Sequence, residues 1–123
     1  MSEARPGIIT ISNLRLRTVI GIFDWERECQ QDIVLNIRLT FDAAASAASD
    51  NIADTVDYKK ITKRIIETVE QSSFFLIEKL ADAVLEVCLE DPKVEEATVR
   101  IDKPHALRFA DSVSVELSKA RAK

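Results

Sequence analysis

Apolar and polar side chains alternate most regularly over residues 32–41. Every second position there is apolar, and these residues are Ile33, Leu35, Ile37, Leu39 and Phe41. Successive side chains of a β-strand point to opposite faces, so this period of two predicts a strand. One face belongs to a core, and the other, which is largely polar, meets water.

A second alternating run covers residues 8–20 and changes parity once. Its apolar positions before and after the change are Ile9, Ile11, Leu14 and Leu16. A strand keeps all of them on one face only if it takes in an extra residue, so we expect a β-bulge or kink at Ser12 and Asn13. Arg15 and Arg17 then share the other face, where they are either solvated or bind an anion.

Residues 94–101 and 109–117 are predicted as two further strands. The segment between them carries Lys103, Pro104, the only histidine of the chain (His105) and Arg108. Proline restricts the residue before it to extended conformations, so we expect Lys103 to project from a stiff site at the end of a strand. Rigidly supported loops often carry catalytic groups, although an ordinary hairpin loop with solvated charges has the same pattern.

Between the two pairs of strands the apolar period lengthens to that of a helix. The stripe of the first helix is Tyr58, Ile61, Ile65 and Val69, and that of the second is Ile77, Leu80, Ala81, Val84 and Cys88. Asp57 is placed to cap the first helix. Glu78 lies near the start of the second helix. Its negative charge either stabilises the N-terminus of that helix or binds a ligand.

Two segments without a regular period are predicted as connections. Residues 42–54 are rich in Ala, Ser and Asp. Residues 21–28 hold three acidic residues, Glu26 among them, and the only tryptophan, Trp25. We expect Trp25 to anchor this loop to the core.

The predicted order of elements is ββααββ, an α+β architecture in which a four-stranded antiparallel sheet carries two helices on its apolar face. One domain spans residues 1–123, with flexible ends at 1–7 and 119–123. Four strands leave two open edges, which invite pairing with another chain. A closed homo-oligomeric ring with a polar inner surface satisfies both edges.

Composition narrows the class of protein. The 17 Lys and Arg are outnumbered by 21 Asp and Glu, and the resulting net charge of −4 argues against a nucleic-acid partner. Cys29 and Cys88 are isolated, as is typical of free thiols in a reducing compartment. No signal peptide is seen, and no run reaches the roughly 20 apolar residues that a membrane span needs. We therefore expect a cytoplasmic protein with no membrane partner.

The residue types also narrow the chemistry. One His and two distant Cys do not supply the ligand spacing of a zinc site, and two Gly are too few for a nucleotide-binding loop. We therefore expect neither metal nor cofactor. Metal-free proton transfer among Lys103, Glu26, Tyr58 and His105 remains possible, provided that the fold brings them together.

Four segments, in this order, resemble the dihydroneopterin aldolase family. They are GIFDWE (21–26), DTVDY (54–58), LIEKLA (76–81) and IDKP (101–104). The resemblance implies the tunnelling fold, in which ββααββ protomers form tetrameric rings. Two rings then stack as an octamer with active sites at subunit interfaces.

The resemblance also implies a role for each matching residue. Glu78 binds the 2-amino group and ring N–H of a pterin through both carboxylate oxygens. Lys103 acts as general acid and base, and Glu26 tunes it. Tyr58 from the neighbouring subunit completes the proton relay. Two more residues line the pterin pocket, namely Asp57 and Ile77.

Two further segments, NLRLRT (13–18) and HALRFADSVS (105–114), resemble one branch of that family. This branch inverts C2′ of 7,8-dihydroneopterin triphosphate to give 7,8-dihydromonapterin triphosphate, in tetrahydromonapterin and folate metabolism. A triphosphate calls for basic side chains at the mouth of the pocket. The candidates are Arg15, Arg17, Lys103, His105 and Arg108.

Two alternatives remain open. One is an aldolase of folate biosynthesis, which shares the metal-free retro-aldol step but releases 6-hydroxymethyl-7,8-dihydropterin and glycolaldehyde. The other is a ring-forming protein that binds pterins without catalysis.

Overall fold

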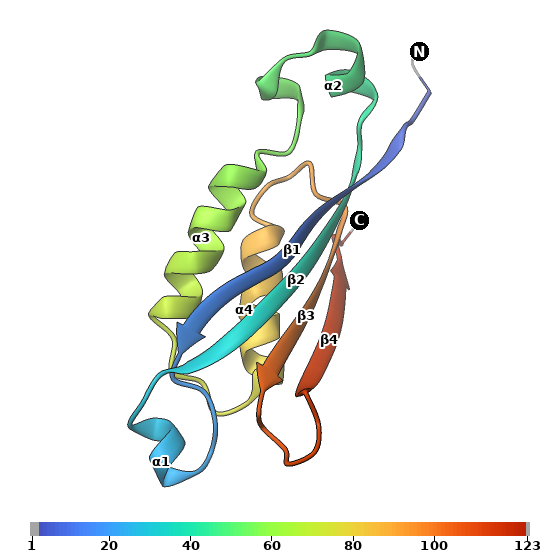
Figure 1. Ribbon diagram of the computed structural model, residues 1–123. Coiled ribbons are helices and arrows are strands. Elements are labelled where there is room, and N and C mark those ends of the chain that lie inside the picture. Colours follow the sequence, from blue (N-terminus) through green and yellow to red (C-terminus); the bar gives the residue numbers. More distant parts are fainter. Residues whose placement is uncertain (1–2, 123) are drawn as a thin grey trace.

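The computed structural model describes residues 3–122. Its long elements follow the predicted order ββααββ (Figure 1). They are β1 (Pro6–Thr18), β2 (Gln31–Asp42), α3 (Tyr58–Glu70), α4 (Ile77–Cys88), β3 (Glu96–Pro104) and β4 (Ser112–Ala120). The short elements are α1 (Asp24–Arg27), α2 (Ala44–Ser49) and a single 3-10 turn, η1 (Ile52–Asp54).

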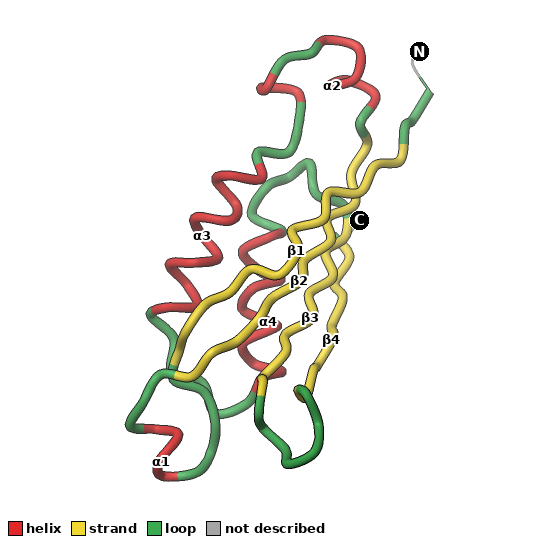
Figure 2. The backbone as a smooth tube through the Cα atoms, in the orientation of Figure 1, coloured by secondary structure: helices red, strands yellow, loops and turns green. Residues whose placement is uncertain are grey.

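The strands form one antiparallel sheet in the order β1-β2-β3-β4. Figure 1 and Figure 2 show α3 and α4 side by side on one face of this sheet. Apolar side chains of the central strands are fully buried against the helices, among them Leu35, Ile37, Val99 and Ile101. The predicted two-layer α+β architecture is confirmed, and β1 and β4 are its two edges.

The bulge predicted in the first strand is confirmed. The register between β1 and β2 shifts between Ile11 and Leu14. Asn13 takes a left-handed φ of 54°, and its N–H donates to Oδ1 of Asn36 at 2.9 Å. After the shift Leu14 pairs with Leu35, so the apolar residues on both sides of the bulge face the core.

Both long helices are held as their residues predict. Asp57 caps α3, because its Oδ1 accepts from the N–H of Lys60 at 3.1 Å. The hydroxyl of Thr18 donates to the carbonyl of Val69 at 2.8 Å, which ties the end of β1 to the end of α3. Burial raises the pKa of the Cys88 thiol on α4 to about 12, so this residue packs as a small apolar side chain. No helix within residues 3–122 has the length and apolar character to cross a membrane.

The structure shows short helical elements in the two segments that were predicted as connections without a regular period. Residues 42–54 contain α2 and η1, and residues 21–28 contain α1. Trp25 does not anchor its loop, because its side chain is 61% exposed. The buried side chain of α1 is Glu26 instead, so the single helical turn directs a carboxylate inward where an aromatic ring was expected.

The last two strands lie further along the chain than the alternation suggested. β3 continues to Pro104, which pairs with Ser112, so Lys103 is a strand residue opposite Val113. At the two ends, β1 begins at Pro6 and β4 extends to Ala120, so strands enter both segments expected to be flexible. Met1, Ser2 and Lys123 lie outside the described residues.

Candidate functional site

A cavity of about 300 Å³ opens at the end of the sheet where β3 finishes and α4 begins. Three segments surround it: the connection from β1 to β2, the start of α4 and the end of β3. Its polar lining residues are Glu26, Gln31, Glu78, Lys103 and His105. The cavity thus collects side chains that lie far apart in the sequence.

A buried ion pair between Lys103 and Glu26 forms the floor of this cavity. Nζ of Lys103 donates to Oε2 of Glu26, and the two side chains are only 12% and 5% exposed. Gln31 Nε2 donates to the same oxygen at 3.2 Å, and the N–H of Phe23 donates to Oε1 at 3.2 Å. Both carboxylate oxygens are therefore satisfied by protein donors.

These contacts decide the protonation of Glu26. Burial by itself raises the pKa of the carboxyl, because it disfavours the charged form. The hydrogen bonds from Lys103, Phe23 and Gln31, together with the charge of Lys103, outweigh it and hold the pKa below its ordinary value of 4.5. Glu26 is thus ionised at neutral pH and is paired with Lys103, which also lines the cavity.

Gly21 makes room for the Glu26 carboxylate. Its φ of 131° lies in the region that favours glycine, and a Cβ at this position would overlap the Glu26 carboxyl group. Any other residue would have to displace the carboxylate from Lys103. One of only two glycines in the chain thus lies where the site requires it.

Arg27 joins the two walls of the cavity. Its Nη1 donates to the carbonyls of Gly21 and Phe74, both at 3.0 Å, and its Nη2 donates to the carbonyl of Ser73 at 2.5 Å. The guanidinium also stacks over the Phe75 ring, 4.1 Å from the centroid. Through these contacts α1 is fixed against the segment that leads into α4.

Ile77 and Glu78 begin α4 and line the same cavity. The Glu78 side chain is exposed, and within residues 3–122 its carboxylate has no ion pair or hydrogen bond. Both carboxylate oxygens are therefore available to accept from a ligand. His105 lies on the opposite rim, at a left-handed φ of 63° that starts the hairpin loop.

The structure does not bring the remaining candidates into this cavity. Arg108, in the hairpin loop, stacks over the exposed Phe109 ring. Arg15 shares a sheet face with Val34 and Asp102, the face opposite to that of Lys103. Arg17 pairs with Asp32 at 3.0 Å.

Asp57 and Tyr58 lie at the end of α3 that is remote from the cavity. They begin α3, whereas Gly21 and Phe75 of the cavity follow Thr18 and Val69, which are in contact near the other end of that helix. Figure 1 shows the end of α3, and not its start, beside the end of β1. With 13 residues, α3 is about 20 Å long. Tyr58 therefore does not reach Lys103 within one chain.

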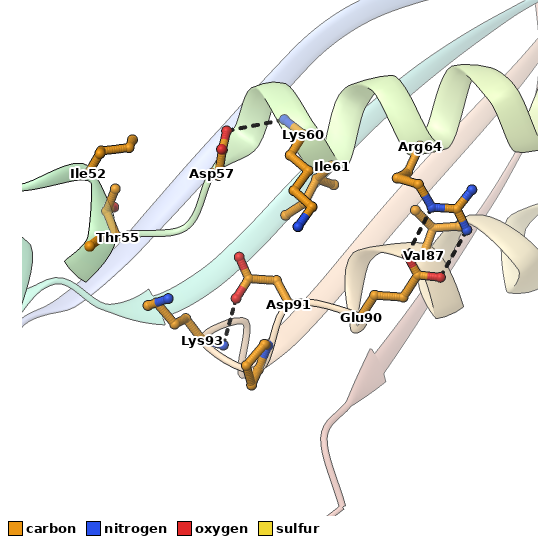
Figure 3. Close-up of a pocket in the computed structure, with 12 residues that line it drawn as sticks. Ile52, Thr55, Asp57, Lys60, Ile61, Arg64, Val87, Glu90, Asp91 and Lys93 are labelled. Carbon is orange, nitrogen blue, oxygen red and sulfur yellow. Dashed lines mark hydrogen bonds and ion pairs between the residues drawn. The ribbon is translucent and has the colours of Figure 1, made fainter.

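A larger hollow, of about 400 Å³, lies at the N-terminal end of α3 (Figure 3). Lys60, Arg64 and Lys93 line it together with Asp57, Glu90 and Asp91, and the guanidinium of Arg64 is bound to Glu90. Its titratable groups are exposed or half-buried, and none of them forms a buried ion pair. The smaller cavity, with its buried ion pair, is therefore the better candidate for chemistry.

The sequence patterns did not indicate three residues of the site, namely Gly21 as a steric requirement, Arg27 and Gln31. The scarcity of glycine was the one available signal, and Gly21 entered the expectations only as the first residue of the GIFDWE segment. Arg27 and Gln31 look like ordinary surface residues in the sequence. Within residues 3–122, no three His, Cys, Asp or Glu side chains are grouped as metal ligands.

The chain is similar to known proteins along almost its whole length. A family model described as dihydroneopterin aldolase (FolB) matches residues 9–118. The chain is 48% identical over 116 residues to the dihydroneopterin triphosphate 2′-epimerase of Escherichia coli K12, covering 94% of this chain and 97% of that protein. It is 41% identical over 120 residues to the Pseudomonas aeruginosa enzyme of the same name, covering 96% and 98%.

Among solved structures, the fold resembles E. coli dihydroneopterin aldolase in complex with neopterin. The TM-score is 0.88 at 31% identity, and the match covers 93% of this chain and 99% of that one. The similarity in sequence is thus greater to the two epimerases than to this aldolase.

Proposed function

The chain belongs to the dihydroneopterin aldolase family, and we propose that it is a 7,8-dihydroneopterin triphosphate 2′-epimerase. The observation that carries the proposal is identity of 48% and 41% to two such epimerases along almost the whole chain. The buried pair of Lys103 and Glu26 beside a cavity of small-ligand size supports it.

The proposed reaction needs no metal and no covalent bond to the protein. Deprotonation of the 2′-hydroxyl lets the C1′–C2′ bond break, and its electron pair moves into the dihydropterin ring. The resulting aldehyde turns over, C1′ attacks its other face, and the new alkoxide takes a proton back. The product is 7,8-dihydromonapterin triphosphate.

The residues around the cavity suit the steps of this reaction. Lys103 moves the proton at the 2′-oxygen, directly or through a water molecule. Glu26, held ionised by three donors, keeps Lys103 in place. Glu78 binds the 2-amino group and ring N–H of the pterin, whose ring lies against Ile77.

A closed site also requires a second copy of the chain. Tyr58 and Asp57 complete the relay and the pterin pocket from a neighbouring protomer, since α3 separates them from Lys103 in their own. The open edges at β1 and β4 offer the contacts for a ring, and two stacked tetrameric rings make an octamer. The apolar rim of the cavity is largely exposed in the protomer, at Ile22, Phe23, Phe75 and Leu76, and is suited to burial by another copy.

Product analysis tests the proposed function. The protein is incubated with 7,8-dihydroneopterin triphosphate, and the erythro and threo products are separated by chromatography. The threo epimer is the expected product. If the aldehyde leaves after C1′ is protonated, 6-hydroxymethyl-7,8-dihydropterin dominates and the protein is an aldolase.

Two variants test the assignment of roles. We expect Lys103→Ala to abolish turnover, because Lys103 is the group that moves the proton at the 2′-oxygen in the proposed reaction. Glu78→Ala is expected to weaken pterin binding chiefly, by about 10- to 100-fold, because it removes a charged acceptor. A Lys103→Ala variant with the turnover of the wild type would contradict the role of Lys103, whereas a wild-type protein that binds the pterin without forming either product would favour a non-catalytic pterin-binding protein.

A further inference from the structure

The first two turns of α3 carry the densest group of basic side chains in the described chain. Lys59, Lys60, Lys63 and Arg64 fall within six residues of a chain whose net charge is −4. Arg64 is engaged by Glu90 at 3.0 Å and by Glu67 at 3.6 Å. Within residues 3–122, the ammonium groups of Lys59 and Lys63 have no ion pair or hydrogen bond.

Lys59 and Lys63 lie on the same side of α3, one turn apart. Both are exposed and line an open hollow of about 470 Å³ along this helix. The hollow begins at Tyr58 and continues past Thr62 to Ile66 and Glu67. Two ammonium groups without an ion pair thus lie near Tyr58, the residue that a neighbouring copy would supply to the active site.

The cavity around Lys103 lacks the cations that a triphosphate needs. Glu26 and Glu78 offset the positive charge of Lys103, and the guanidinium of Arg27 is occupied by three carbonyls. A triphosphate carries several negative charges and binds best to Lys or Arg. Apart from Lys103 and His105, no basic side chain of the described residues lines this cavity, so a neighbouring copy is a candidate source of the remaining cations.

We propose that Lys59 and Lys63 bind the triphosphate of a substrate whose pterin lies in the Lys103 cavity of a neighbouring copy. The proposal rests on the proposed function, which brings Tyr58 of one copy to that cavity of the next. Lys59 adjoins Tyr58 in the sequence, and Lys63 follows one turn later. The pair therefore selects the triphosphate over 7,8-dihydroneopterin itself.

The hollow on the other side of α3 provides a matched control. Lys60 and Lys93 are also exposed lysines, but they line the hollow of Figure 3 together with Asp57, Glu90 and Asp91. Three carboxylates and three basic groups line this second hollow. Their charges cancel, and the second hollow is therefore not expected to bind a polyanion. Replacing Lys60 and Lys93 removes the same charge from the protein as replacing the other pair.

The test compares two double variants, Lys59→Gln/Lys63→Gln and Lys60→Gln/Lys93→Gln. Calorimetry measures the Kd for 7,8-dihydroneopterin triphosphate and for 7,8-dihydroneopterin. We expect the first variant to bind the triphosphate about 10- to 100-fold more weakly, because it loses two charge-assisted contacts that are partly screened by water. Its Kd for 7,8-dihydroneopterin is expected to change by less than about twofold. For the control variant, the Kd for each of the two ligands is expected to change by less than about twofold as well.

Three results would overturn the proposal: equal weakening for both ligands, no weakening for the triphosphate, or the same loss in the control variant. Lys59→Arg/Lys63→Arg is expected to bind the triphosphate within about threefold of the wild type, since it keeps both charges. Circular dichroism verifies that each variant is folded.

Turnover separates this proposal from the proposed function. A wild-type protein that forms no threo epimer refutes the epimerase, whereas the Kd values still decide whether the two lysines recognise the triphosphate. A wild-type protein that binds the triphosphate no more tightly than 7,8-dihydroneopterin refutes the lysine site, whatever reaction the protein catalyses.

Discussion

At the scale of single residues, Glu26 depends on its three donors for its charge. The lysine, the amide of Gln31 and the backbone N–H of Phe23 replace the water that burial removes. An unpaired buried carboxylate would take up a proton instead. The same contacts hold Lys103 at the cavity, so the charge of Glu26 serves both stability and the proposed chemistry.

This charge makes the stability of the protein dependent on pH. Because the pKa of Glu26 is lowered in the folded protein, its stabilising effect is present above about pH 4.5 and is lost as the pH falls through the folded value. We expect Glu26→Gln to unfold with a free energy about 1–3 kcal/mol lower at pH 7. The difference should shrink as the pH falls below 4.5, as measured by urea unfolding at several pH values.

Glu86→Gln is the control for this experiment. Glu86 pairs with Lys119, but their side chains are 57% and 46% exposed. Such a surface pair is screened by water, so its loss should change the free energy of unfolding little. If Glu26→Gln lowered the free energy of unfolding by the same amount at every pH from 7 to 3, the carboxylate charge would not stabilise the fold.

At the scale of elements, α1 and the start of α4 are joined through Arg27. A one-turn helix has little stability of its own, so the position of Glu26 depends on contacts outside α1. Arg27 supplies them through the carbonyls of Gly21, Ser73 and Phe74. We interpret Arg27 as a positioning residue that holds Glu26 against Lys103.

We expect Arg27→Lys to lower kcat by about 10-fold, with a smaller effect on KM. A lysine keeps the charge but cannot donate to three carbonyls in the fork geometry of a guanidinium. Loss of these contacts should also lower the free energy of unfolding by about 1–3 kcal/mol. Steady-state kinetics and urea unfolding measure the two effects.

Arg121→Lys is a close control, because Arg121 makes the same kind of contact at the other end of the protein. It donates to the carbonyls of Val94, Leu89 and Asp91 at 3.0, 2.7 and 2.8 Å. Its replacement should cost similar stability and leave kcat unchanged. Equal losses of kcat in both variants, at equal folded fraction, would assign Arg27 a purely structural role.

At the scale of the whole molecule, the proposed site is divided between copies. Tyr58 begins α3, whereas Lys103 lies at the end of β3, and Figure 1 shows the start of α3 and the end of β3 well apart in the protomer. Each site of a ring would then take its proton-transferring lysine from one copy and its tyrosine from the next. In the proposed ring, the β1 and β4 edges would provide the repeating contact.

Mixed oligomers test this division. Lys103→Ala and Tyr58→Phe are each expected to lose most activity alone. Co-expression in equal amounts should restore up to about a quarter of wild-type activity, because about one site in four then combines an intact lysine with an intact tyrosine. Mixing the folded homo-oligomers without subunit exchange is the control. An inactive co-expressed mixture would contradict a shared site.

The sequence by itself determined which long elements form and in what order. Alternation in residues 32–41 and the helical stripe from Ile61 to Val69 are local patterns, and so is the parity change at Ser12 and Asn13. Each arises because a side chain must face either the core or water within its own element. Family resemblance added expected roles for Lys103, Glu26 and Glu78.

Only the tertiary structure decided which of these residues meet. Lys103 and Glu26 are 77 positions apart, and their ion pair depends on β3 continuing past its predicted end and on α1 turning Glu26 inward. Tyr58 is separated from them because α3 is a rigid rod about 20 Å long. Contacts between elements follow from packing in three dimensions, which no local period of the sequence encodes.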